Sequence, residues 1–111
     1  MLRDSKVYLQ DILDAAAKIL RYTEGMDAKR LASDTKTLDA VVRNLEVIGE
    51  AAKNLPEEMR SQPTAIDWKK IAGLRDILIH RYFGVDVDII WDVIHNRLPL
   101  LESEVRRLLG G

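Results

Sequence analysis

The residues best suited to chemistry lie between Gly73 and Asp86. This segment holds Arg75, then His80 after four intervening residues, then Tyr82 after one more. Arginine is a permanent cation that suits phosphate, and histidine is the side chain that exchanges protons near neutral pH. The combination indicates chemistry on a phosphate-bearing molecule.

Helical spacing decides which of these side chains can meet. Asp76 and His80 are four residues apart, so the carboxylate could contact and orient the imidazole on a helix. Arg75 and Tyr82 are seven apart and fall nearly on one line. Arg75 and His80 are five apart, which separates them by roughly 140° around a helix, so they do not converge within one straight helix.

Two arrangements would bring Arg75 and His80 into one site. The helix could end or distort near His80 and swing the imidazole toward the arginine. Alternatively, two copies of the motif could face each other across a symmetric dimer, since a two-fold interface presents the same patch twice. We favour the dimer.

Cleavage of RNA matches these residues without a metal. The 2′-hydroxyl of RNA supplies the nucleophile, so the protein needs a proton-transfer group and a cation. His80 could serve as general base or acid, and Arg75 would stabilise charge that develops on the phosphate oxygens. Tyr82 could bind a phosphate or stack on a base. The expected product carries a 2′,3′-cyclic phosphate.

A structural explanation of the same residues is also open. Arg75 could pair with an acidic side chain, and His80 could cap the end of a helix. The local charge favours a phosphate ligand, because basic residues outnumber acidic ones by three between Arg60 and Arg81 on a chain of net charge −1. Lys69 and Lys70 in this segment fit a solvated face equally well.

The other candidate residues point to structure. His95 is expected at the surface or at an interface. Glu46 and Glu50 are four apart and could bind a metal, but no matching pair exists elsewhere, so a structural role is favoured. Trp68 and Trp91 are expected to anchor the core or an interface.

Apolar periodicity predicts helices nearly everywhere, and strand signals are absent. The four longer predicted helices run from Ser5 to about Glu24 after an Asp4 cap, from about Asp34 to Leu55–Pro56, from an Asp67 cap to about Phe83–Gly84, and from Asp86 or Asp88 to the carboxyl end.

Shorter features lie between and within these helices. A linker that contains Met26 and Leu31 is expected after Gly25. The segment from Pro56 to Arg60 reads as a single helical turn with proline at its first position. Pro99 cannot donate to the carbonyl of His95, so a kink or break is expected there.

The sum is an all-α fold, an antiparallel four- to five-helix up-and-down bundle, with residues 1–111 as a single domain. Hydrophobic residues make up 47% of the chain and charged residues 32%. The absence of cysteine excludes disulfides and thiolate metal sites, and two histidines argue against a multi-histidine metal site. No signal-peptide-like or membrane-spanning run is found, so a cytoplasmic protein is expected.

Two stretches of the chain resemble the HepT-like proteins of the HEPN superfamily. One runs from Arg43 to Pro56 as RNLEVIGEAAKNLP. The other runs from Trp68 to Asp86 as WKKIAGLRDILIHRYFGVD and is followed by Ile90–Trp91. The Arg-x4-His-x-Tyr signature in this context is specific, whereas the bare Arg-x4-His spacing is not.

The resemblance implies a dimeric, metal-independent endoribonuclease without a cofactor, the toxin of a HepT/MntA-type toxin–antitoxin pair. Arg75 and His80 would be the catalytic pair in a cleft at the homodimer interface, with Asp76 in support. Tyr82 would be modified with AMP by a cognate minimal nucleotidyltransferase antitoxin, which would block RNA with bulk and negative charge.

Two other readings stay open. The chain could be a non-catalytic HEPN module that binds a nucleotide or a nucleotidyltransferase, or a plain helical dimerisation domain. The intact motif favours the ribonuclease, whereas the net charge of −1 mildly favours the non-catalytic module, because nucleases usually carry more positive charge.

Overall fold

The computed structural model describes residues 4–61, 64, 66–80 and 86–110, with the side chains of residues 75–80 excepted. Every regular element in this part of the chain is helical, which confirms the all-α prediction. In chain order the elements are α1 (Ser5–Tyr22), α2 (Ala28–Ser33), α3 (Thr35–Lys53), α4 (Glu57–Arg60), α5 (Trp68–His80), α6 (Val87–Asp92), the π-helical segment η2 (Val93–Arg97) and α7 (Leu98–Gly110).

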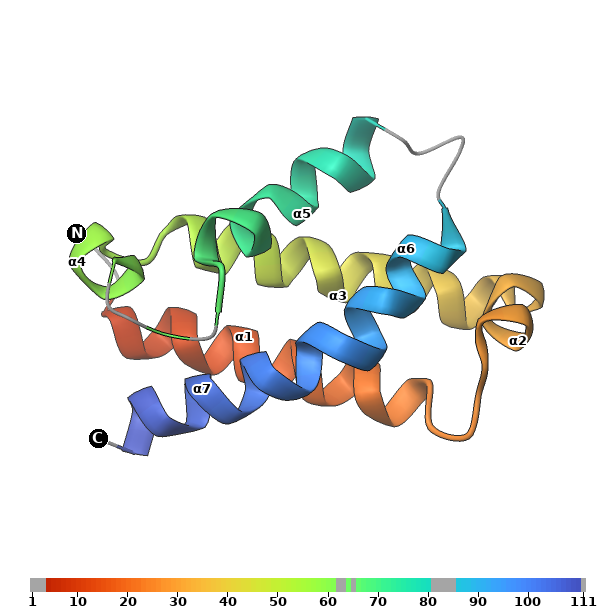
Figure 1. The fold of residues 1–111 in the computed structure, drawn as a ribbon, viewed down its shortest axis with the longest axis horizontal. Coiled ribbons are helices and arrows are strands. Elements are labelled where there is room, and N and C mark those ends of the chain that lie inside the picture. The colour runs from red at the N-terminus through yellow and green to blue at the C-terminus, as the bar shows by residue number, and fades with distance from the viewer. Residues whose placement is uncertain (1–3, 62–63, 65, 81–85, 111) are drawn as a thin grey trace.

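The long helices form an antiparallel bundle. Helix α1 packs against α3 and α7, and α3 also packs against α5. Figure 1 shows α1 and α5 running in one direction while α3 and the α6–η2–α7 rod run in the other. The short helices α2 and α4 lie at opposite ends of the bundle (Figure 1). This arrangement agrees with the predicted up-and-down topology.

The core is made by the apolar stripes that the periodicity predicted. Each long helix turns one stripe inward, and burying such a stripe is the main source of stability for a helix in water. The fully buried large side chains are Leu9, Ile12, Ile19, Leu31, Val41, Leu45, Ile48, Leu98, Leu101 and Val105.

Helix α1 ends two residues earlier than predicted, at Tyr22. Thr23 is 5% exposed, and its hydroxyl donates a 2.8 Å hydrogen bond to the carbonyl of Ile19, so the side chain competes with helix continuation. Gly25 follows with φ of 77°, a left-handed conformation that glycine adopts at low cost.

The predicted linker around Leu31 is wrong in its second half, because residues 28–33 form α2. The carboxylate of Asp27 caps this helix by accepting a 2.8 Å hydrogen bond from the N–H of Arg30. Leu31 is 0% exposed, and α2 contacts both α3 and α6. Tertiary burial of one leucine therefore stabilises a helix too short to form alone.

The predicted turn from Pro56 to Arg60 is found as α4, but Pro56 is its cap and Glu57 its first residue. A kink or break was expected at Pro99, but the last helix is not broken there, since η2 runs directly into α7. The distortion is instead absorbed by η2, in which the N–H of Leu98 bonds to the carbonyl of Val93, five residues back.

Within the described ranges, no helix is both long and apolar enough to span a membrane.

Candidate active site

The amino-terminal end of α5 is firmly fixed to the bundle. Asp67 caps the helix, since its carboxylate accepts a 3.2 Å hydrogen bond from the N–H of Lys70 and its carbonyl accepts one of 3.1 Å from Ile71. The side chains of Trp68 and Ile71 are only 3% and 4% exposed. Cap and buried anchors together set the register of the helix that carries the motif.

The backbone of α5 is helical through His80, so Arg75, Asp76 and His80 all lie on one helix. Asp76 and His80 are one turn apart on it. Arg75 and His80 are separated by about 140° around the axis and about 7.5 Å along it, as the spacing predicted. The helix therefore does not end between the two catalytic candidates.

The details of the predicted site lie outside what the structure describes. The side chains of Arg75, Asp76 and His80 belong to the excepted group, and Tyr82 lies among residues 81–85. The predicted helix end near Phe83–Gly84 lies outside the described residues as well. The described residues continue at Asp86, whose carboxylate caps α6 by accepting a 2.9 Å hydrogen bond from the N–H of Asp88. The composite site therefore stays a prediction about these positions.

The second histidine lies at the surface, as predicted. His95 is exposed on η2, and its ring stacks on that of Trp91 with centroids 6.3 Å apart and planes 16° from parallel. Trp91 itself is partly buried against the core, and Trp68 is a core residue. His95 thus serves as a natural control for experiments on His80.

The two glutamates of α3 line a groove on the α1–α3 surface. Glu46 and Glu50 share it with Arg43, and its volume is about 430 Å³. Within the described residues, no group of three or more histidine or acidic side chains is arranged to hold a metal ion.

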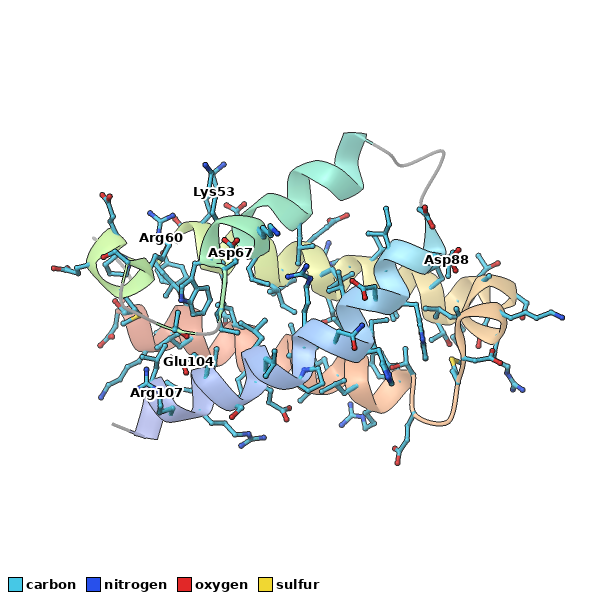
Figure 2. The ribbon with its side chains drawn as sticks, viewed as in Figure 1. Lys53, Arg60, Asp67, Asp88, Glu104 and Arg107 are labelled. Atoms are coloured by element: carbon cyan, nitrogen blue, oxygen red, sulfur yellow. The ribbon has the colours of Figure 1, made fainter. Side chains whose placement is uncertain are left out.

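Ion pairs on α7 are structural. Arg107 donates hydrogen bonds of 2.6 and 3.1 Å to Glu104, and this contact, with a further hydrogen bond from the Thr64 hydroxyl, lowers the pKa of the Glu104 carboxyl. The same contact raises the pKa of the Arg107 guanidinium. Both residues lie on α7 near the carboxyl terminus of the chain (Figure 2), and the contact keeps both side chains charged.

One grouping of residues was missed by sequence reasoning. Arg60 of α4 and Lys69 of α5 line a common groove, together with the edge of Trp68. The local excess of basic residues signalled this surface, but the two cations are nine positions apart on separate helices, and only the fold places both along one groove.

Fold and motif define a class of protein, a helical bundle that carries an Arg-x4-His pair on a helix in the middle of the chain, α5. The family model described as "Ribonuclease HepT-like" matches residues 12–108. The chain therefore belongs to the HepT-like ribonuclease family of the HEPN superfamily, which confirms the resemblance.

Three curated relatives match along most of their own length. A protein of Thermococcus cleftensis named "Probable ribonuclease HepT" is 40% identical over 97% of this chain and 98% of its own. Proteins from Methanocaldococcus jannaschii and Caldanaerobacter subterraneus subsp. tengcongensis, both provisionally named as RNases, are 42% and 41% identical over 96% and 97% of this chain and 88% and 96% of their own. No solved structure matches the chain significantly.

Proposed function

We propose that the chain is a metal-independent endoribonuclease and the toxin of a HepT/MntA-type toxin–antitoxin pair. One observation carries the proposal. Arg75, His80 and Tyr82 stand at the signature spacing, inside the matched range of a family described as ribonuclease. Relatives named as RNases support the activity.

The chemistry follows from the residue types. The 2′-oxygen of RNA attacks the adjacent phosphorus, the bond to the 5′-oxygen breaks, and a 2′,3′-cyclic phosphate results. His80 either takes the proton from the 2′-hydroxyl or gives one to the leaving 5′-oxygen. Arg75 stabilises the charge on the non-bridging oxygens, and Asp76, one turn before His80, positions the imidazole.

The site is completed by a second copy of the chain. Arg75 and His80 are about 140° apart around a helix that is regular between them, which disfavours convergence within one protomer. A two-fold dimer places the Arg75 position of one protomer opposite the His80 position of its partner.

The activity is tested with purified full-length chain and total RNA in the presence of EDTA. Wild type is expected to cut, and His80→Ala is expected to lose about 10²- to 10⁴-fold in rate, the usual contribution of a general acid or base. His95→Ala is the matched control, because it removes an exposed histidine on another helix, and it should retain activity.

The competing function is a non-catalytic HEPN module, which the net charge of −1 favours. A wild-type chain that cuts no RNA at any dose, while it still binds nucleotide or a nucleotidyltransferase, would replace the ribonuclease with this module.

Regulation is proposed at Tyr82. The phenolic oxygen forms a bond to the α-phosphorus of ATP, pyrophosphate leaves, and the hydroxyl proton is released. Intact mass after incubation with a minimal nucleotidyltransferase and ATP should rise by whole AMP units and cleavage should fall. Tyr82→Phe should block both effects, whereas Tyr22→Phe, which alters a tyrosine 39% exposed on α1, should block neither.

A further inference from the structure

A basic groove lies at the end of the bundle where α4 meets the start of α5. The described residues that line it are Glu57, Arg60, Ser61, Trp68 and Lys69, and its volume is about 400 Å³. Figure 2 shows Arg60 at the same end of the molecule as Asp67, the cap of α5. The groove is therefore attached to the helix that carries Arg75 and His80.

Arg60 holds a donor that its surroundings do not use. The side chain is partly buried, and its Nε is shielded from solvent without donating a hydrogen bond to any group the structure describes. The guanidinium of Arg60 also lines the groove, and a phosphate oxygen is the acceptor that the fork of arginine fits best. The exposed ammonium of Lys69 and the hydroxyl of Ser61 add donors along the same groove.

The remaining wall residues narrow the class of ligand. Trp68 is 3% exposed, so it offers an edge to the groove and no open face on which a base could stack. Glu57 contributes one negative charge and leaves the described lining with a net charge of +1. The groove therefore suits the sugar–phosphate backbone and carries no means of reading bases.

Helix register connects the groove with the motif. Lys69 and His80 are eleven residues apart on α5, which puts their positions about 20° apart around the axis and about 16 Å along it. The two positions thus share one side of the helix, at a separation that a few nucleotides of single-stranded RNA would span.

We infer that the Arg60–Lys69 groove binds the backbone of the RNA substrate, with one phosphate contact from each cation, a few nucleotides from the bond that is cut. The inference rests on the proposed ribonuclease function. The contacts position the strand along α5 independently of base sequence, so they strengthen RNA binding without taking part in the reaction.

The test measures binding of a 2′-O-methyl RNA oligonucleotide, which lacks the attacking hydroxyl, to the full-length chain between about 50 and 200 mM salt. The double variant Arg60→Gln/Lys69→Gln should bind more weakly. The slope of log K against log salt should become shallower by about 1.4, which is 0.7 for each lost phosphate contact to a single strand.

The control variant is Lys29→Gln/Arg30→Gln. It removes the same two charges from α2, at the opposite end of the bundle (Figure 1), and should leave the slope within error of wild type. Lys69→Gln alone alters an exposed side chain, so it tests the groove even if replacing Arg60 destabilises the fold. It should make the slope shallower by about 0.7. Equal slopes for the groove and control variants overturn the inference, as does a wild type that binds no RNA.

Cleavage of unmodified RNA separates this inference from the proposed function. The groove variant should keep the kcat of wild type and raise KM, since it loses binding alone. A chain that binds the oligonucleotide with the predicted slopes but cuts nothing would overturn the ribonuclease and keep the groove. If the wild-type chain cuts RNA and the groove variant has the same salt slope as wild type, the groove is overturned and the ribonuclease is kept.

Discussion

The carboxylate of Asp67 accepts a hydrogen bond of 3.2 Å from the backbone N–H of Lys70, and this contact begins α5. The start of the helix fixes the direction in which each later residue of α5 projects, because α5 runs as one helix from Trp68 to His80. The capping side chain thus lies about two turns before Arg75 and at the opposite end of the helix from His80.

Removing this cap should loosen the helix start. Asp67→Ala is expected to lower the free energy of unfolding by about 1 kcal/mol, within the range of about 0.5–2 kcal/mol for such caps, because the N–H of Lys70 loses its acceptor. Urea denaturation followed by circular dichroism measures the change. Asp67→Ser keeps a capping oxygen and should be close to wild type, so equal losses for both variants would argue against the cap.

The core of the bundle should be far more sensitive than its surface. Ile48 on α3 is 0% exposed, and Ile48→Ala should destabilise the protein by about 2–5 kcal/mol through lost burial and a residual cavity. Leu100 on α7 is 52% exposed, and Leu100→Ala should change stability by no more than about 0.5 kcal/mol. Similar midpoints for the two variants in denaturant would contradict the packing of α3 in the core.

A shared site should be recoverable by mixing two inactive chains. Arg75→Ala and His80→Ala homodimers are each expected to be inactive. Refolding them together in equal amounts makes half of the dimers mixed, and one of the two sites in each mixed dimer then pairs an intact Arg75 with an intact His80. About a quarter of wild-type cleavage should return. Absence of recovery, with mixed dimers verified by native mass spectrometry, would place both residues of a working site on one protomer.

The ion pair of Glu104 and Arg107 should contribute to stability in a pH-dependent way. The pKa of Glu104 is lowered in the folded state by its hydrogen bonds from Arg107, so the stabilisation is present above the unfolded value of about 4.5 and is lost as the pH falls through the lower folded value. Glu104→Gln should reduce the difference in melting temperature between pH 7 and acidic pH.

Replacing the partner provides the control for this pair. Arg107→Gln removes the donor and should flatten the acid dependence in the same direction, and the double variant should add little more. An acid profile that neither substitution changes would show that other carboxyl groups dominate acid unfolding.

Much of the fold could be read from local signals. The apolar periodicity of α1 and α3 and the capping residues Asp4, Asp34 and Asp67 act within a few residues, so the sequence alone placed these helix starts correctly. The Arg-x4-His-x-Tyr signature and the stretches around it are likewise local properties, and together they pointed to the family whose model matches the chain.

The remaining features depend on contacts between distant parts of the chain. Helix α2 forms because Leu31 is buried and the helix contacts α3 and α6. The pattern of six residues in sequence does not show that this burial will occur. Pro99 signalled a distortion, but the helical rod continues from α6 into α7 and the distortion takes the form of η2.

The chain by itself determined the long helices, their starts and the pair of residues suited to phosphate chemistry, because hydrogen bonds and apolar stripes within a helix are set by neighbours in sequence. Only the tertiary structure decided that Arg60 and Lys69 share a groove, since this depends on where the fold places α4 relative to the start of α5. Burial of side chains from separate helices is a cooperative, non-local free energy, and it alone selects which surface residues become neighbours.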